Sequence, residues 1–393
     1  MKIAYLGKIQ LSDVDLSYLH EAQKKSDITC IMEITPRFCH GPAFNLDKVA
    51  NRTGIFKATD VYPEFSKYGG FIDLDKFYIL NISGKLWQLK AFWANFLLLL
   101  FLVRKGFDVI HVVWPLNIYE FVLYLLRRKM ILTVHDPFPH TGLDTFIVRF
   151  RRKMAFRLVP KFILLNKAQV GQFSDFYKIG KNRIFVSKLS EYTYLHTVTP
   201  DFSTVPPEQH YILFIGKISR YKGLDYLLPA MEKVHAKYSG VKLVVAGGGK
   251  YHFDISKYLS ADYIDIRNRF IPDSEMVALM SKAQFVVCPY TDATQSGVIM
   301  SAFAFRVPVL ATCVGGLPEM VGNGRLGVLV KEKSVDALAD GICELLGNDG
   351  MLCKLHDNIE SAYSGNGELS WMTIANGLRD VYEELADSAP KHS

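Results

Sequence analysis

Short runs of apolar and β-branched residues recur along the chain, and longer stretches with helical patterning separate them. The runs are four or five residues long and largely apolar, which is what a strand requires when helices cover both faces of its sheet. The pattern therefore predicts an α/β protein with parallel sheets. The runs are Ile3–Leu6, Val109–Val113, Met130–Val134, Phe162–Leu165, Tyr211–Ile215, Lys242–Ala246, Phe285–Cys288, Val307–Ala311 and Gly327–Val330.

The length predicts two domains, because 393 residues exceed what a single core usually supports. The stretch Thr197–Gln209 is rich in Pro, Ser and Thr, lacks periodicity and directly precedes an apolar run. We therefore expect Rossmann-like domains over residues 1–205 and 206–370. Two such domains leave a central cleft facing the carboxyl ends of both sheets, where open parallel sheets bind ligands.

Composition excludes a disordered or fibrous chain, because 49% of the residues are hydrophobic and only 22% are charged. The six cysteines lack the paired spacing of metal ligands, and several lie in apolar runs, so we expect reduced core residues in a cytoplasmic protein. The segment Met1–Gly7 predicts a strand rather than a signal peptide. No His, Asp and Glu residues cluster at a recognisable metal-ligand spacing.

The first half of the chain is basic. Residues 1–200 contain 28 Lys and Arg against 16 Asp and Glu, a balance of +12, and the remainder contains 18 against 23, a balance of −5. The basic clusters lie at Arg127–Lys129 and Arg149–Lys153. They either contact phosphate groups, such as those of an anionic membrane, or form solvated helix faces. The apolar stretch Ala91–Val103 is too short to span a bilayer and is either a helix packed on a sheet or one that dips into a membrane surface.

The segment Ile215–Gly223 reads as a strand end followed by a basic turn, and the amphipathic stretch Leu224–Lys237 follows it. Lys217 and Lys222 lie on either side of this turn, close to Gly216. A nucleotide diphosphate that leaves during bond cleavage needs fixed positive charge, which these two lysines can provide.

A second polar segment, Tyr290–Gln295, leads from a predicted strand into an apolar helix. Free backbone N–H groups and the helix dipole at this start favour a phosphate group. The amides concerned belong to Gln295, Ser296, Gly297 and Val298. A third turn, Gly315–Glu319, has Pro318 at an expected first helical position, which predicts that Glu319 lies near a helix N-terminus.

The order of these motifs over residues 210–385 resembles the retaining glycosyltransferases of family 4, which have the GT-B fold. The resemblance implies that Lys217 and Lys222 contact the donor diphosphate, with Lys217 standing where arginine is typical. It also implies metal-independent transfer and a final helix, residues 371–393, that crosses back to the first domain. The further motifs that carry it are Ala246–Gly249, Pro272–Met276, Gln295–Gly297, Gly315–Glu319 and a helix beginning at Trp371.

One departure from the family concerns two glutamates, eight positions apart, that hold the donor sugar and the ribose. Ser301 stands where the second is expected, and Asp292 is the nearest carboxylate that could orient the sugar. In the first half, Met130–Pro137 resembles a family strand that ends in a histidine facing the cleft. His135 is therefore a catalytic candidate. Residues near it are acceptor-site candidates, namely His111, His140 and Asp136, which would fix the His135 tautomer.

The expected function is transfer of a sugar, with retention of configuration, from a nucleotide-sugar donor to a glycan or lipid-linked acceptor. This suits polysaccharide or glycoconjugate biosynthesis at the inner face of a membrane and needs no cofactor beyond the donor substrate. A nucleotide-sugar epimerase and a degenerate sugar-nucleotide-binding protein remain alternatives. A dinucleotide dehydrogenase is disfavoured because no Gly-x-Gly-x-x-Gly follows the first strand. Nucleic acid is not expected as a partner, because the basic clusters lack a recognition motif.

Overall fold

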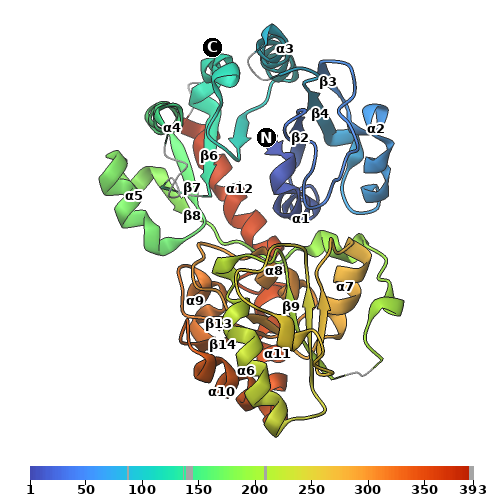
Figure 1. Ribbon diagram of the computed structural model, residues 1–393. Coiled ribbons are helices and arrows are strands. Elements are labelled where there is room, and N and C mark those ends of the chain that lie inside the picture. The colour runs from blue at the N-terminus through green and yellow to red at the C-terminus, as the bar shows by residue number, and fades with distance from the viewer. Residues whose placement is uncertain (86–87, 136, 139–144, 208–209, 389–393) are drawn as a thin grey trace. The chain divides into compact units, whose positions relative to one another are not determined.

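The computed structural model describes residues 1–85, 88–135, 137–138, 145–207 and 210–388 (Figure 1). The chain divides into two compact units. Unit 1 comprises Met1–Leu189 and Glu368–Ser393, and unit 2 comprises Ser190–Gly367. Each unit is built on one largely parallel sheet, so the α/β prediction is confirmed.

The sheet of unit 1 has the strand order β3-β4-β2-β1-β5-β6-β7-β8. Its strands are parallel except β3, which pairs antiparallel with β4. The strands are β1 (Lys2–Lys8), β2 (Asp27–Ile34), β3 (Gly54–Lys57), β4 (Phe77–Asn81), β5 (Val109–Val112), β6 (Met130–Val134), β7 (Lys161–Leu164) and β8 (Ile184–Val186).

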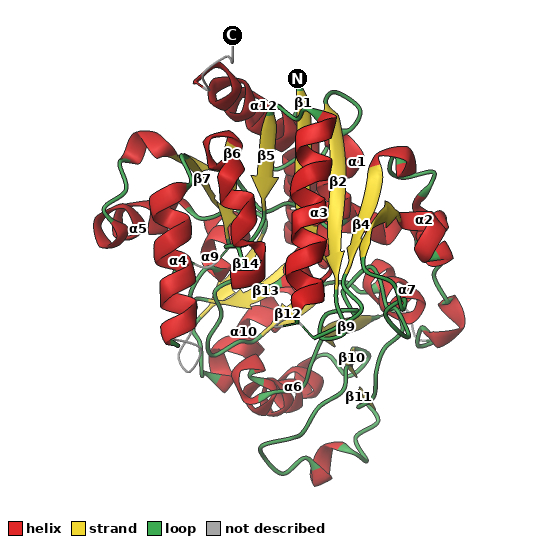
Figure 2. Ribbon diagram, turned by 90° about the horizontal axis from the view of Figure 1, so that it is seen from above, coloured by secondary structure: helices red, strands yellow, loops and turns green. Residues whose placement is uncertain are grey.

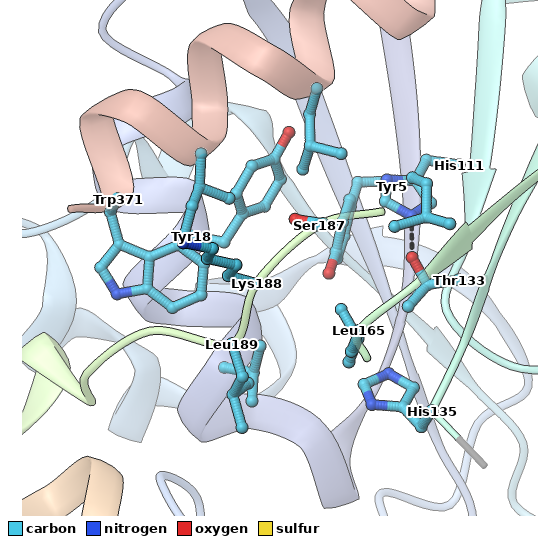
Figure 3. Close-up of a pocket in the computed structure, with 14 residues that line it drawn as sticks. Tyr5, Tyr18, His111, Thr133, His135, Leu165, Ser187, Lys188, Leu189 and Trp371 are labelled. Carbon is cyan, nitrogen blue, oxygen red and sulfur yellow. Dashed lines mark hydrogen bonds between the residues drawn. The ribbon is translucent and has the colours of Figure 1, made fainter. Parts of the chain in front are cut away.

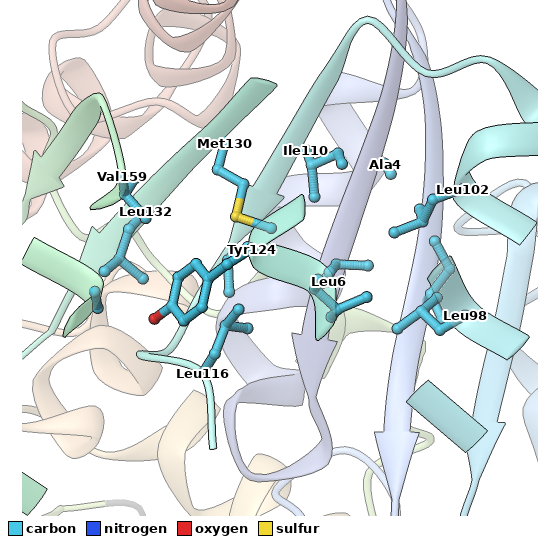
Figure 4. Packing of buried hydrophobic residues seen from close by; sticks show 14 of the residues in the cluster. Ala4, Leu6, Leu98, Leu102, Ile110, Leu116, Tyr124, Met130, Leu132 and Val159 are labelled. Atoms are coloured by element: carbon cyan, nitrogen blue, oxygen red, sulfur yellow. The ribbon is translucent and has the colours of Figure 1, made fainter. Parts of the chain in front are cut away.

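Helices cover both faces of this sheet. On one face, Ala4 and Leu6 of β1 join a buried cluster with Leu98 and Leu102, and the cluster extends to Met130 and neighbouring strands (Figure 4). This face is covered by α3 (Leu89–Lys105), η4 (Ile118–Lys129), α4 (Phe146–Leu158) and α5 (Val170–Tyr177). The other face is covered by α1 (Ser12–Ala22) and α12 (Trp371–Ser388), which contact each other. The shorter helices are η1 (Ile9–Leu11), α2 (Ala58–Val61), η2 (Pro63–Tyr68), η3 (Leu74–Lys76), η5 (Lys167–Gln169) and η6 (Lys181–Arg183).

The sheet of unit 2 has the strand order β11-β10-β9-β12-β13-β14, and all of its pairs are parallel. The strands are β9 (Tyr211–Ile215), β10 (Lys242–Ala246), β11 (Ile264–Arg267), β12 (Val286–Cys288), β13 (Val309–Thr312) and β14 (Gly327–Val330). The helices are α6 (Leu224–Lys237), α7 (Asp273–Lys282), α8 (Gly297–Ala304), α9 (Leu317–Met320), α10 (Val335–Leu346) and α11 (Asp349–Tyr363), with η7 (Thr193–Thr197), η8 (Phe202–Thr204), η9 (Arg220–Lys222), η10 (Ser256–Tyr258) and η11 (Gly322–Gly324).

The chain passes from unit 1 to unit 2 after Leu189, earlier than the predicted boundary after residue 205. Residues from 190 onward are bound to unit 2: the Tyr192 N–H donates to the Met300 carbonyl at 3.3 Å, and the Asp201 N–H donates to the Ser274 carbonyl at 3.0 Å. The Pro- and Ser-rich stretch thus packs on unit 2 instead of linking two domains. The final helix α12 belongs to unit 1, in agreement with the predicted return of the chain.

The helix predicted over Ala91–Val103 is α3, and it is only half buried. Ala94, Leu98 and Leu102 face the core, whereas Phe92 and Trp93 on the opposite side are exposed. The helix ends at Gly106, whose φ of 66° is a left-handed conformation that glycine adopts without strain. None of the helices in the described part of the chain is both long and apolar enough to cross a bilayer.

Candidate functional site

The basic turn after β9 packs against the segment that follows β12. Gly223 has a φ of 69°, and a Cβ atom at this position would come within 1.8 Å of the Pro289 carbonyl oxygen, so only glycine fits. Gly216, with a φ of 124°, lies beside Val298: a Cβ atom on it would be 3.5 Å from Val298 Cγ2. The Thr291 N–H donates to the Tyr221 carbonyl at 2.8 Å. Two segments far apart in the sequence are therefore held together at the carboxyl ends of neighbouring strands.

Lys222 connects this turn to the predicted phosphate-binding loop. Its Nζ lies 3.7 Å from the centroid of the Tyr290 ring, and the Tyr290 hydroxyl is 3.2 Å from Ser296 Oγ. Burial lowers the pKa of Lys222, while the π face of Tyr290 favours its ammonium form. The predicted partner Lys217 is exposed. The contact with Tyr290 thus places the Lys222 ammonium group next to the predicted phosphate-binding loop.

Residues 295–298 span the N-terminus of α8, and we call its first turn open because no N-cap side chain covers its N–H groups. Ser296 is the N-cap residue, but its side chain caps no backbone N–H; its own N–H donates to Met320 Sδ at 3.3 Å. The Ser296 amide is therefore used internally, contrary to the prediction that it is free. The amides of Gly297 and Val298 belong to the first turn of α8, where N–H groups have no intrahelical partner. Such a turn binds anions.

The third turn, between β13 and α9, supports this loop from the other side. The Gly316 N–H donates to the Ala293 carbonyl at 3.2 Å, and a Cβ atom at Gly315 (φ 50°) would lie 1.7 Å from the same oxygen. Asp292 and Glu319 are exposed beside this contact. The segment after β12 therefore packs against both the turn after β9 and the turn after β13.

Ser301 offers no replacement for a carboxylate. Its side chain is buried, and its hydroxyl donates to the Gly297 carbonyl at 3.0 Å, one turn back in α8. Because the hydroxyl is bonded to its own helix, Asp292 remains the nearest acidic group on this loop.

Unit 1 contains a separate pocket of about 40 Å³ at the carboxyl ends of β5 and β6 (Figure 3). His135, which directly follows β6, lies on its wall, and its ring centroid is 6.2 Å from that of Trp114. A space of this size admits a hydroxyl group or a water molecule, not a whole sugar ring. The acceptor-site candidates Asp136 and His140 lie outside the described residues.

His111 has a different environment from the one predicted. Its Nδ1 is 2.7 Å from the Tyr382 hydroxyl and its Nε2 is 2.7 Å from Thr133 Oγ1, so both ring nitrogens are already hydrogen-bonded. Burial and the neighbouring His135 lower the pKa of His111 to about 3, and the ring is neutral. The Tyr382 hydroxyl is 2.8 Å from that of Tyr18. His111 thus ties β5 and β6 to α12 and α1, and neither nitrogen is left for an acceptor.

Three charged side chains that the sequence analysis did not single out meet at the carboxyl end of β1. Lys8 Nζ lies 2.9 Å from Glu33 Oε2 of β2 and 2.6 Å from Glu120 Oε1 of η4. Tyr119 donates to Glu33 Oε1 at 3.2 Å, and the Asn117 N–H donates to Glu120 Oε2 at 2.5 Å. We call Lys8, Glu33 and Glu120 the charged triad. The Asn117–Glu120 capping box was the one local signal for it.

The two carboxyl groups of the triad have different electrostatic environments. Burial raises the pKa of Glu33 to about 7, because the opposing effect of Lys8 is only partial and Glu120 adds repulsion. Burial also acts on Glu120, but Lys8 and the Asn117 N–H outweigh it and its pKa is lowered. The triad thus contains one carboxyl group, that of Glu120, whose ionised form is favoured, and another, that of Glu33, which titrates near neutral pH.

Among the described residues, no group of three or more His, Cys, Asp or Glu side chains could hold a metal ion.

Comparison with known proteins assigns the chain to a family. A family model for glycosyl transferases group 1 matches residues 209–348. An uncharacterized glycosyltransferase of Methanocaldococcus jannaschii is 30% identical over 300 residues, which cover 72% of this chain and 77% of the relative. A D-inositol 3-phosphate glycosyltransferase of Corynebacterium aurimucosum is 26% identical over 56% of each chain. The crystal structure of Anabaena HepE in complex with UDP superimposes with a TM-score of 0.68 and 15% identity, covering 98% of this chain and 100% of HepE, which shows the shared GT-B fold. The chain belongs to the group 1 glycosyl transferases.

Proposed function

We propose that this glycosyltransferase moves a sugar, with retention of configuration, from a nucleotide-sugar donor bound by unit 2 to a glycan or lipid-linked acceptor bound by unit 1. The observation that carries the proposal is the position of Lys222, held over Tyr290 beside the open first turn of α8. That arrangement suits a diphosphate. Anabaena HepE, which has the same fold, has been solved with UDP and with UDP-glucose.

In the proposed reaction, the bond between the anomeric carbon and the diphosphate oxygen breaks as a bond to the acceptor oxygen forms on the same face. The acceptor proton passes to the departing phosphate. Lys222, with Lys217 and the amides at the start of α8, stabilises the negative charge that develops on the diphosphate. These charges are fixed in the protein, so the proposed step uses no metal ion.

The donor sugar is proposed to lie against the loop between β12 and α8. Asp292 and Gln295 of this loop orient its hydroxyl groups, while Glu319 lies on the neighbouring turn. Support comes from the contact of Ala293 with Gly315 and Gly316, which fixes the loop beside both residues. Because Ser301 has no carboxylate, the ribose has one charged contact fewer than in typical family members.

Replacing His135 with alanine is expected to lower kcat for transfer by about 100-fold or more, because the imidazole on the pocket wall orients the acceptor hydroxyl. The dissociation constant for the donor is expected to stay within about twofold, since the donor is bound by unit 2. Steady-state kinetics together with calorimetric donor binding measure both quantities. Exposed His356 provides the control variant His356→Ala. Equal losses in donor affinity and kcat would contradict a role on the acceptor side.

The function itself is tested by incubating the full chain with a panel of nucleotide sugars and acceptor extracts, and by determining the anomeric configuration of the product by NMR. Retained configuration with release of free nucleotide supports the proposal. Inverted product contradicts the retaining mechanism. Conversion of the sugar nucleotide to an isomer without acceptor would show an epimerase, and donor binding without turnover would show a degenerate binding protein.

We further propose that the enzyme works in polysaccharide or glycoconjugate biosynthesis on the cytoplasmic side of a membrane. The six cysteines are free thiols, three of them buried, which suits a reducing compartment.

A further inference from the structure

Three helices of unit 1 lie on one face of the sheet: α3 and α4, which Figure 2 shows, and η4, which contacts both of them. The Phe121 ring of η4 lies 6.1 Å from the Phe150 ring of α4, and η4 also packs against α3. Their outward sides carry large apolar side chains that are exposed. These are Leu89, Phe92, Trp93, Phe96, Leu100 and Val103 of α3, Ile118 and Leu125 of η4, and Phe146, Ile147 and Phe150 of α4. We call this set the apolar surface of unit 1.

The helix α3 shows why this surface is unusual. A helix at the surface of a globular protein normally has a polar outer side. In α3 the inner side supplies Leu98 and Leu102 to the core, and the outer side is apolar as well, with Trp93 56% and Leu89 87% exposed. Exposed apolar surface of this extent marks an interaction site.

The charges around the apolar surface identify its partner. The only carboxylate in α3, η4 and α4 is Glu120, which is 4% exposed and paired with Lys8. The exposed charges on the three helices are therefore all positive. They are Lys90, Arg104, Lys105, Arg127, Arg128, Arg149, Lys153 and Arg157. A second copy of this surface would bring like charges together, whereas a bilayer offers both an apolar interior and anionic headgroups.

Arg151 does not belong to this set, although the sequence placed it in a basic cluster. Its Nη2 and Nε donate to the carbonyls of Pro115 and Leu116, at 2.7 and 3.1 Å. This guanidinium anchors α4 to the segment before η4 and is not a free surface cation.

The apolar surface extends to the sheet edge that carries the acceptor candidate. Helices that connect parallel strands run antiparallel to them, so the N-termini of α3 and α4 lie at the edge where β5 and β6 end. Leu89 and Phe146 begin these helices, Trp93 starts the second turn of α3, and His135 follows β6 at the same edge.

We propose that unit 1 docks on an anionic lipid bilayer through this surface, with the aromatic and aliphatic side chains at headgroup depth and the surrounding cations against lipid phosphates. Docking would bring the His135 edge to the membrane. Docking favours a lipid-linked acceptor, and this part of the inference rests on the proposed function.

The test is flotation of the full chain with vesicles of phosphatidylcholine alone or with about one third phosphatidylglycerol. We expect at least about tenfold more protein to float with the anionic vesicles, and most of this binding to disappear at about 0.5 M salt, where charges are screened over a few ångströms. Absence of flotation at low salt, or equal flotation with neutral vesicles, would overturn anionic docking.

Two double variants locate the contact. Trp93→Ser with Phe96→Ser is expected to reduce flotation by about tenfold, because both exposed rings leave the bilayer interface. Phe202→Ser with Leu259→Ser removes exposed apolar groups of unit 2 and is expected to float like the wild type. Light scattering follows the mass of each protein in solution. If the wild type is a dimer that the first variant dissociates, the surface binds a second copy and the proposal is wrong.

The same preparations are assayed for transfer to a water-soluble acceptor. Full transfer activity without flotation would overturn the docking proposal and leave the proposed function intact. Flotation without any turnover of donor would support the docking proposal and contradict the proposed function.

Discussion

Replacing Lys222 with methionine is expected to lower kcat/KM for sugar transfer by about 10²- to 10³-fold, the usual effect of removing one fixed group that stabilises developing negative charge. The methionine side chain keeps most of the packing on the Tyr290 ring, whose centroid lies 3.7 Å from Lys222 Nζ. What is lost is the positive charge beside the first turn of α8. Steady-state kinetics with a saturating acceptor measure the effect.

The matched control for this variant is Lys237→Met, at an exposed lysine near the end of α6. It makes the same change of charge in the same unit, away from the turn after β9, and is expected to retain wild-type kinetics within about twofold. If both variants lose activity equally, or if Lys222→Met stays near wild type while folded, Lys222 does not stabilise the leaving group.

Replacing Lys8 with methionine is expected to destabilise unit 1 by about 3–5 kcal/mol near pH 7.5, because two buried carboxylates lose their shared cation. Lys8 Nζ is 2.6 Å from Glu120 and 2.9 Å from Glu33, and both carboxylates are buried. All four tryptophans of the chain fall within the residue ranges of unit 1. Urea unfolding followed by tryptophan fluorescence therefore reports this unit selectively.

The deficit is expected to shrink as the pH is lowered. The folded-state pKa of Glu33 is already raised to about 7, above that of an unfolded glutamate, so the folded protein binds this proton more tightly. Its contribution to stability is therefore present at low pH and lost as the pH rises through the interval up to about 7. Without Lys8 the pKa rises further, and protonation near pH 5 relieves the repulsion with Glu120.

Two further variants make this prediction specific. Lys8→Met combined with Glu33→Gln is expected to recover part of the loss near pH 7.5, since one uncompensated charge is gone. Lys24→Met removes the lysine of an exposed pair with Glu21 and is expected to cost less than about 1 kcal/mol. A Lys8→Met deficit no larger than that of Lys24→Met, or one that does not change with pH, would show that the triad does not act as a buried ion cluster.

Much of the architecture could be predicted from local sequence because strands buried on both faces must be apolar. The predicted runs coincide with β6, β9, β10 and β14. Five strands were missed, namely β2, β3, β4, β8 and β11. Of these, β2 contains Asp27 and Glu33, and β4 ends in Asn81, which break the apolar pattern. Their burial depends on partners elsewhere in the chain, as the Lys8–Glu33 pair shows.

The candidate donor site was predictable to the extent that it is made of short motifs. The glycines at 223 and 315 and the open start of α8 have local signatures, because each reflects a backbone conformation or a helix terminus. The contact of Lys222 with Tyr290 and the bonding of His111 to Tyr382 join residues that are distant in sequence. No local pattern specifies such pairs, so the sequence alone does not distinguish Lys222 from Lys217 or show that both nitrogens of His111 are bonded.

In the proposed function, Lys222 and the start of α8 together bind the donor diphosphate. Calorimetric titration of the full chain with nucleoside diphosphates and the matching nucleosides tests it most directly. We predict that the wild type and Lys237→Met bind one nucleoside diphosphate of the panel at least about tenfold more tightly than the matching nucleoside, as expected for charge-assisted bonds to phosphate. We predict that Lys222→Met loses this preference. A preference that survives unchanged in Lys222→Met would contradict the account.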